Sequence, residues 1–410
     1  MNTAAAATAA TASRNPGPLA GLKVVEISSL GPGPFCAMLL SDMGAEVVRV
    51  DRAETVDFVG EPGPLNIPIE GMPLFRGRGS LGVDLKHPDG VAAVLRLVAQ
   101  ADILLEGYRP GVMEKLGLGP AVCCQLNPRL IYGRVSGYGQ DGPLAQSPGH
   151  DINYIALSGV LAMIGNDPNS APVPPLSLAG DFGGAGMALA FGVLSAVYER
   201  GRSGQGQVID CSMVESASYI ATLFHGLLRT GHHKPTRGGN MVDGGCHFYN
   251  SYQTADGQWV AVAAVLPKFY ANFLRALGLD PATLPAQTDE AAWPEMKARI
   301  AAIFRGQPLA YWNERMLNAD HCYSPVLSPL DAPAHPQNLA REAFVDIGGI
   351  VQPAPAPRLS RTPGWVKGPP QEAGRQSRAL LAGWGFTPQE IDALHASGAV
   401  RSSQRGEKAT

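Results

Sequence analysis

Several features that would place this chain in a special class of protein are scarce in its sequence. Only 16% of its 410 residues are charged and the formal net charge is -3. That balance gives no reason to expect a nucleic acid or an anionic membrane as a partner. No uninterrupted apolar run approaches the roughly 20 residues that span a bilayer. A hydrophobic share of 45% is nevertheless sufficient for sizeable cores, and the length predicts about two to three domains.

Cysteine is present but lacks the spacing of a disulfide framework or a metal site. None of the six cysteines forms a Cys-x-x-Cys pair, and two are adjacent, Cys123-Cys124, in a stretch that is typical of a helix. We interpret these two as packing residues. A reducing cytosol is the simplest setting for such a chain, so the sequence predicts a cytoplasmic protein without a bound metal.

The two ends of the chain carry no clear targeting signal. Residues 1–18 are rich in Ala and Thr, with one Arg and no acidic residue. That composition faintly resembles a transit peptide, but it has no clear amphipathic pattern, and a disordered tail is the preferred interpretation. The last four residues, Glu407-Lys408-Ala409-Thr410, are no peroxisomal signal.

The first hundred residues contain the pattern of an α/β protein. An apolar, β-branched run at Leu22–Ile27 is followed by a glycine turn, a helical stretch at Phe35–Met43 and a second strand at Ala45–Val50. Strand, turn, helix and strand in this order predict a βαβ unit and therefore a parallel sheet. The mixed, aperiodic stretch Ala53–Gly71 is expected to be a surface loop.

The glycine turn imitates a dinucleotide-binding motif. Gly31-x-Gly33 is followed twenty residues later by Asp51, at the spacing of the acidic residue that binds a ribose. The third glycine position is occupied by Cys36, and Pro32 and Pro34 remove N–H donors that a pyrophosphate would need. We therefore reject a nicotinamide dehydrogenase.

Four cations cluster at predicted strand ends, namely Arg76, Arg78, Lys86 and Arg109. Ligands of open α/β sheets bind at the carboxyl ends of strands. Each cation taken alone could be an ordinary solvated loop residue. Taken together, in a chain of otherwise ordinary charge, they predict a site for phosphate groups.

The stretch Gly149–Met187 offers an imidazole and a carboxylate, His150 and Asp181, each next to glycine and each leading into an apolar helical run. Proton transfer needs two groups that titrate near the working pH, on backbone that can approach a substrate closely. A spacing of 31 residues suits no single helix face, so the fold would have to bring two element ends together. The alternative is a pair of ordinary capped helix starts.

A collinear series of motifs makes the chain resemble the α-methylacyl-CoA racemases of the class III CoA-transferase (CaiB/BaiF) superfamily. The motifs, which lie between about Leu19 and Pro363, are Gly31-Pro32-Gly33-Pro34, Val47-Val48-Arg49-Val50-Asp51-Arg52, Asp84-Leu85-Lys86, Glu106-Gly107-Tyr108-Arg109-Pro110-Gly111-Val112, Gly149-His150-Asp151-Ile152-Asn153-Tyr154, Gly180-Asp181-Phe182, Gly204-Gln205-Gly206-Gln207-Val208 and Asn240-Met241-Val242-Asp243-Gly244-Gly245.

The resemblance implies an interlocked homodimer with a Rossmann-like, parallel-sheet large domain and a smaller α+β domain. In these terms the chain divides into a disordered tail (1–18), the first part of a large CoA-binding domain (19–229), a small domain (230–330), a stretch that returns to the large domain (331–370) and a tail (371–410). Each active site would lie between the large domain of one subunit and the small domain of the other.

The resemblance also implies a site. His150 and Asp181 would be the two acid/base residues, and the backbone of Asp151 would bind the thioester oxygen. The substrate would be a 2-methyl-branched acyl-CoA whose α-carbon is inverted through an enolate, with no cofactor, because CoA is part of the substrate. The implied CoA-binding and neighbouring residues are Arg52, Arg76, Val83, Lys86, Arg109, Lys115, Gly149 and Tyr154.

One position departs from the racemase pattern. The racemases carry a glutamate in the small-domain segment that reads Ala261-Val262-Ala263-Ala264-Val265-Leu266-Pro267 in this chain, and Leu266 stands in its place. A leucine cannot orient an imidazole or share a proton. Asp243 and His247 lie in a segment from which they could substitute for the missing carboxylate.

Two other functions stay open at this point. A CoA transferase of the same superfamily would use Asp181 as a nucleophile and form a mixed anhydride. Such transferases usually lack a histidine at the position of His150, so its presence favours the racemase. A non-catalytic acyl-CoA-binding protein is the third possibility, because Leu266 leaves the catalytic set incomplete.

Overall fold

The computed structural model describes residues 16–56, 69–317 and 319–403, and the predictions made above for residues 1–15, 57–68 and 404–410 lie outside this part. The chain forms two compact units. The first comprises residues 1–148, 181–213 and 341–410, and the second comprises residues 149–180 and 214–340.

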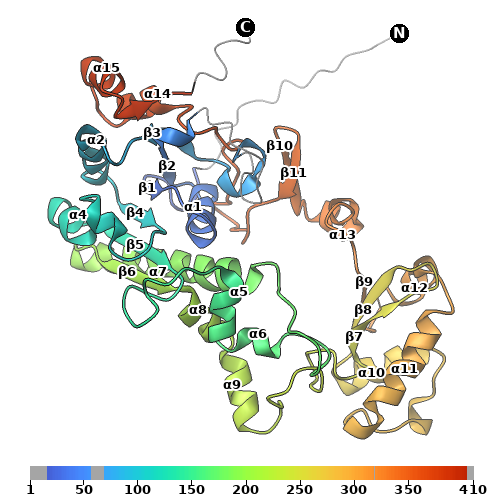
Figure 1. The fold of residues 1–410 in the computed structure, drawn as a ribbon. Coiled ribbons are helices and arrows are strands. Elements are labelled where there is room, and N and C mark those ends of the chain that lie inside the picture. The colour runs from blue at the N-terminus through green and yellow to red at the C-terminus, as the bar shows by residue number, and fades with distance from the viewer. Residues whose placement is uncertain (1–15, 57–68, 318, 404–410) are drawn as a thin grey trace, which may run out of the picture. The chain divides into compact units, whose positions relative to one another are not determined.

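The first unit is built on a seven-stranded sheet with the order β12-β3-β2-β1-β4-β5-β6 (Figure 1). All neighbouring strands are parallel except β12, which pairs antiparallel with β3. The run β3-β2-β1-β4-β5-β6 is the strand order of a doubly wound nucleotide-binding fold, in which the order reverses between β1 and β4. The prediction of an α/β fold with a parallel sheet is confirmed. The strands are β1 (Lys23–Ile27), β2 (Glu46–Arg52), β3 (Gly79–Val83), β4 (Ile103–Glu106), β5 (Ile131–Ser136), β6 (Val208–Ser212) and β12 (Val400–Arg401).

Two hydrophobic cores cover the two faces of this sheet. Alternation along a strand sends neighbouring side chains to opposite faces, so Val24 belongs to one core and Val25 to the other. Cys123 is fully buried in one core and Cys124 packs against it, as predicted from their position in a helix. The helices of the unit are α1 (Pro32–Asp42), α2 (Pro88–Val98), α3 (Val112–Lys115), α4 (Pro120–Leu126), α7 (Met187–Ser203), α14 (Ser377–Gly383) and α15 (Pro388–Ala396).

Helix α7 continues from a π-helical stretch, Leu178–Gly186. Leu189, Ala190 and Val193 of α7 are buried against the sheet. The π-helical stretch and α7 together span Leu178–Ser203. In the described part of the chain, this is the one helix that is long and apolar enough to cross a membrane, judged by length and composition alone. Because a core helix of a soluble protein passes the same test, this length and composition are weak evidence for a membrane.

The second unit combines short helices with a small antiparallel sheet of order β7-β8-β9. Its main core is rich in aromatic side chains, and a smaller one joins Ile155 and Val160 to Ala217 and Ala221. The turn Ala255-Asp256-Gly257 connects β7 and β8, which pair as an antiparallel hairpin. The elements are α5 (Asp151–Leu157), α6 (Val160–Met163), α8 (Met213–Ile220, whose first residue falls in the first unit), α9 (Thr222–Arg229), β7 (Tyr249–Gln253), β8 (Trp259–Ala263), α10 (Pro267–Ala276), α11 (Trp293–Phe304), α12 (Leu309–Met316), β9 (Tyr323–Pro325) and α13 (Pro336–Ala340).

The last part of the chain belongs to the first unit. A two-stranded antiparallel ribbon, β10 (Phe344–Ile347) and β11 (Ile350–Pro353), precedes an extended stretch. Residues 377–403, placed in a tail from the sequence, instead form α14, α15 and strand β12 of the main sheet. The physical reason is burial, since Leu381 and Trp384 are at most 1% exposed.

Candidate active site

A pocket of about 400 Å³ lies at the carboxyl ends of β2, β3 and β4 in the first unit. This is the edge at which open α/β sheets bind their ligands. Three predicted cations, Arg52, Lys86 and Arg109, line it, and Val83 contributes an apolar wall. A cationic rim over apolar side chains suits a ligand with a flat apolar body and phosphate groups. The remaining lining residues are Glu54, Asp84, Leu85, Tyr108, Val112 and Leu116.

Tyr108 is the central aromatic residue of this pocket, and sequence reasoning did not single it out. The Arg52 guanidinium lies 5.6 Å from the centroid of the Tyr108 ring. A hydrogen bond with Tyr108 raises the pKa of Arg52 above its ordinary value, and the same contact holds the guanidinium beside the ring. The available signal was the place of Tyr108 beside Arg109, directly after a buried strand.

A buried carboxylate fixes the turn that carries Tyr108 and Arg109. Glu106, at the end of β4, accepts a hydrogen bond from the Tyr108 N–H at 2.7 Å. Arg134 of β5 donates to Glu106 at 2.7 Å and to Glu114 of α3 at 2.8 Å. Burial raises the pKa of Glu106, and Arg134 acts in the opposite direction. Arg134 therefore ties the strand end to the short helix beside the pocket.

Two of the four clustered cations do not reach the pocket. Arg76 is 3% exposed and donates to Asp42 at 2.6 Å, to Gln352 at 3.0 Å and to the Pro353 carbonyl at 2.7 Å. Arg78 is 2% exposed and binds Glu26 at 2.8 Å. A buried guanidinium needs such partners because desolvation is costly. The assignment of Arg76 to CoA is therefore replaced by a structural ion pair.

Lys115 also lies outside the pocket lining. It is exposed at the end of α3, between the lining residues Val112 and Leu116. Its ammonium is thus on the neighbouring surface rather than in the pocket.

Asp181 lies at the point where the strand order reverses. It belongs to the π-helical stretch before α7 rather than to a helix cap, which corrects the interpretation as an N-cap. A Cβ added to Gly31, after β1, would come within 3.3 Å of the Asp181 carboxylate. Gly31 also has a φ of 72°, which favours glycine. The Gly-Pro-Gly-Pro turn is therefore shaped to receive the aspartate, at the start of α1.

Aromatic and glycine packing holds this turn of the π-helical stretch. The rings of Phe35 and Phe182 lie 5.4 Å apart, and a Cβ on Gly186 would come within 2.7 Å of the Phe35 ring. Single π-helical turns within helices occur frequently at functional sites. The backbone at Asp181 is thus set by specific packing on α1.

His150 immediately precedes α5 in the second unit and is exposed. Its N–H donates to the Asn153 side chain at 3.0 Å, and Tyr154 donates its hydroxyl to the Gly149 carbonyl. Gly149 and Tyr154 thus support the backbone on both sides of the imidazole.

One hydrogen bond links the two motifs. The carboxylate of Asp151, which is 5% exposed, accepts from the Gly180 N–H at 2.8 Å. Gly180 is required here because a Cβ would come within 2.5 Å of that carboxylate. The residue after His150 is therefore bonded to the residue before Asp181, and consecutive Cα atoms are only about 3.8 Å apart.

The similarity to known proteins agrees with this arrangement. A model of CoA-transferase family III matches residues 19–376, which is most of the chain. The chain belongs to CoA-transferase family III. It is 45% identical to the α-methylacyl-CoA racemase of Mus musculus, over 94% of this chain and 98% of the relative, and 42% identical to that of Homo sapiens, with the same coverage. A crystal structure of a CaiB/BaiF family protein from Brucella suis superposes with a TM-score of 0.76 at 25% identity, over 90% of this chain and 99% of that one.

In this member of CoA-transferase family III, Asp243 and His247 both have other partners and do not replace the glutamate whose position Leu266 occupies. Asp243 accepts from the N–H groups of Gly238, Asn240 and Gly245, at 2.7 to 3.0 Å. Its carboxylate therefore organises its own loop. Leu266 itself is 58% exposed at the start of α10.

His247 is buried in the core of the second unit. It is 1% exposed, and its Nε2 lies 2.7 Å from the Tyr270 hydroxyl. Burial lowers the pKa of His247 to about 4. A neutral imidazole in such surroundings serves packing, so the hypothesis that His247 replaces the glutamate is not supported by the structure.

Proposed function

We propose that the chain is an α-methylacyl-CoA racemase, which inverts the α-carbon of 2-methyl-branched acyl-CoA thioesters. The observation that carries the proposal is the 45% identity to such a racemase over nearly all of both chains. The hydrogen bond between Asp151 and Gly180 adds support, because it couples the motif of His150 to that of Asp181.

In this proposal the first unit binds CoA and the two motifs perform the chemistry. Arg52, Lys86 and Arg109 neutralise phosphates, while Val83 and Tyr108 contact the adenine. His150 removes the α-proton on one face and Asp181 delivers a proton to the other, the two exchanging roles in the reverse direction. The backbone of Asp151 stabilises the enolate oxygen. No further cofactor takes part, since the chemistry needs only proton transfer.

We further propose that the protein is a cytoplasmic homodimer. Helix α7 exposes a stripe of apolar side chains at the spacing of one helix face, with Met187 50%, Phe191 75%, Leu194 42% and Tyr198 73% exposed. Such a stripe on one face of a helix is typical of a protein interface. A second copy accounts for it while the opposite face packs on the sheet. Sedimentation of Phe191→Asp should then show a monomer, and an unchanged dimer would exclude this face.

The decisive test is α-proton exchange of a 2-methylacyl-CoA in D₂O, with the configuration of the product followed. Wild type should exchange the proton with inversion, and His150→Ala should lose at least a hundredfold in rate, the usual contribution of a positioned base. Asn153→Ala is the control. It removes the acceptor of the His150 N–H but leaves the imidazole, so it should reduce the exchange rate far less than His150→Ala.

The family name makes CoA transfer the second candidate function. The Asp181 carboxylate, held against Gly31, could attack a thioester and form a mixed anhydride with release of the CoA thiolate. Transfer of CoA to a free acid without α-proton exchange would contradict the racemase. Binding of acyl-CoA with neither reaction would identify a non-catalytic binding protein.

A further inference from the structure

Residues near the C-terminus form the edge of the main sheet next to the pocket of the first unit. We call residues 371–403 the C-terminal segment; it contains α14, α15 and β12. The family match ends at residue 376, so most of this segment lies beyond it. In Figure 1 the segment lies beside β3 and α2, although about 300 residues separate them in the chain.

Three alternate backbone N–H groups along and just after β3 are bound by this segment. The Ser80 N–H donates to the Gln376 side chain at 3.3 Å, and the Gly82 N–H to the Ser377 hydroxyl at 3.1 Å. The Asp84 N–H donates to the Ala399 carbonyl at 2.9 Å. Without the C-terminal segment, β3 would be an open edge with unpaired donors.

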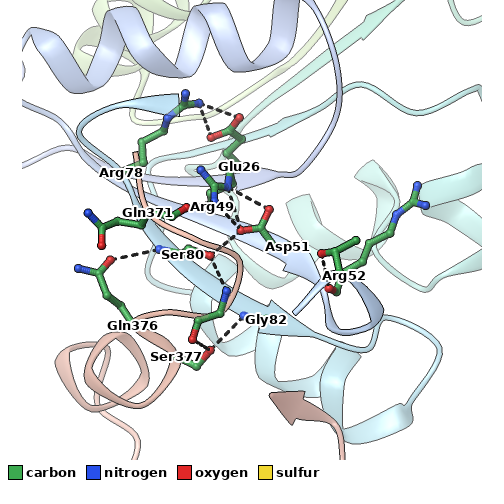
Figure 2. A network of polar contacts seen from close by, with 12 residues as sticks. Glu26, Arg49, Asp51, Arg52, Arg78, Ser80, Gly82, Gln371, Gln376 and Ser377 are labelled. Atoms are coloured by element: carbon green, nitrogen blue, oxygen red, sulfur yellow. Dashed lines mark hydrogen bonds and ion pairs between the residues drawn. The ribbon is translucent and has the colours of Figure 1, made fainter. Parts of the chain in front are cut away.

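The segment is in turn anchored to the sheet by polar contacts (Figure 2). The Gly374 N–H donates to the Ser80 hydroxyl at 2.8 Å, and that hydroxyl donates to Asp51 at 2.5 Å. Arg49 binds Asp51 at 2.9 Å and donates to the Gln371 carbonyl at 2.8 Å. The segment, β2 and the start of β3 thus share one buried network.

Hydrophobic packing reinforces the same attachment. Trp384 is 1% exposed and donates its ring N–H to Glu46 of β2 at 2.8 Å. Gly82 shows how closely the two parts approach, since a Cβ there would lie 2.8 Å from the Arg401 carbonyl. The segment is therefore an integral part of the sheet.

The strand held in this way leads directly into the pocket. Val83, Asp84, Leu85 and Lys86 all line it. Val83 pairs with Val400 on one side and with Arg52, a further lining residue, on the other. One wall of the pocket therefore has its position set by β12 and α14.

We propose that the C-terminal segment is the positioning element of the CoA pocket, with Ser377 as its principal positioning residue. This inference rests on the proposed function, because it takes CoA as the ligand. Binding linkage is reciprocal. Bound CoA therefore stabilises the docked segment to the same extent that the docked segment favours CoA.

The first test compares Ser377→Ala with Thr387→Ala by calorimetric titration of CoA into the full chain. Ser377→Ala leaves the Gly82 N–H without its acceptor and should raise the Kd for CoA roughly threefold to tenfold, the effect of one such hydrogen bond. Thr387 caps α15 without a contact to β3. Thr387→Ala should lower the Tm about as much as Ser377→Ala does, because each loses one hydrogen bond, but it should leave the Kd for CoA unchanged.

The outcomes separate the inference from the proposed function. If wild type does not bind CoA, both are wrong. If wild type binds CoA and Ser377→Ala binds equally well despite a lower Tm, only the positioning role is wrong. Should Ser377→Ala not fold, Gln376→Ala tests the same point through the Ser80 N–H and carries the same expectation.

A second measurement uses hydrogen exchange on the wild-type chain. Addition of CoA should slow exchange of the amides of residues 80–84 and 399–401 and leave those of α15 unchanged. Equal protection of all three regions, or of none, would contradict a specific coupling between CoA and β12.

Discussion

The interiors of the two units differ in kind. The first unit buries charged side chains in pairs, whereas the main core of the second unit is formed by aromatic and aliphatic residues. The buried pairs of the first unit are Arg49–Asp51, Arg76–Asp42, Arg78–Glu26 and Arg134–Glu106. In the main core of the second unit, the rings of Tyr252 and Phe304 stack, and the ring of Trp312 packs edge-on against Phe304.

The position of the buried charges explains this difference. Glu26, Asp51 and Glu106 all lie at or near the carboxyl ends of their strands, the edge that carries the pocket and the Gly31 turn. Buried ion pairs contribute little net stability, but they fix geometry, because breaking one leaves a charge without a partner. These buried charges thus fix the edge that carries the pocket, while the hydrophobic cores of both units supply stability.

The largest expected effect comes from breaking one pair. Arg78→Met leaves Glu26 buried at 1% exposure without its partner, and should lower the free energy of unfolding by about 3–5 kcal/mol. Urea denaturation measures this change. The double variant Arg78→Met/Glu26→Leu should recover most of the loss. If the double variant were as unstable as the single one, the charge would not be the cause.

This pair also marks the limit of what the sequence revealed. In the sequence, all four cations of the cluster lie next to predicted strands. Only the fold shows that Arg76 and Arg78 are buried in ion pairs, whereas Lys86 and Arg109 line the pocket. Their acidic partners, Asp42 and Glu26, lie in an apolar helix and an apolar strand, 34 and 52 residues away. Nothing local in the chain indicates such a pairing, since it depends on which face each side chain takes.

The second prediction concerns the apolar interior. His247 is neutral in the folded state with a pKa of about 4, against 6.5 when unfolded. Between these values the unfolded chain binds the extra proton, so the free energy of unfolding falls as pH is lowered from 6.5 towards 4. The full loss is about 3 kcal/mol for a shift of this size. Stability of His247→Phe, measured by denaturation at a series of pH values, should lack this loss.

His335 offers a control for that pH dependence. It is a histidine of the same unit at the start of α13, outside the aromatic core. His335→Phe should retain the loss of stability between pH 6.5 and 4. If His247→Phe and His335→Phe behaved alike, the buried imidazole would not be responsible.

The motifs were more predictable than the groups that hold them. His150 and Asp181 each follow a glycine, and Gly31 begins a Gly-Pro-Gly-Pro run, so these motifs stand out in the printed sequence. Gly180 could not be assigned a role, because its requirement comes from Asp151, 29 residues away. Likewise, nothing in the sequence indicates that β12 completes the main sheet, since a two-residue strand has no periodicity to detect.

The smallest expected effect tests whether exposed cations differ from buried ones. Arg52 is exposed at the pocket rim, so Arg52→Gln should leave the free energy of unfolding nearly unchanged, as is usual for surface positions. It should weaken CoA binding by about tenfold at low salt, and by less at high salt, because screening weakens an exposed phosphate contact. Calorimetric titration at two salt concentrations measures both quantities.

Arg202→Gln is the matched control, a basic residue in the last turn of α7 in the same unit but not in the pocket lining. It should change neither stability nor CoA affinity. Arg52 and Arg78 carry the same guanidinium group in two settings: beside Glu26 it neutralises a buried carboxylate, and at the rim we propose that it binds the phosphates of CoA. If Arg52→Gln destabilised the fold as strongly as Arg78→Met, this division between interior and rim would be wrong.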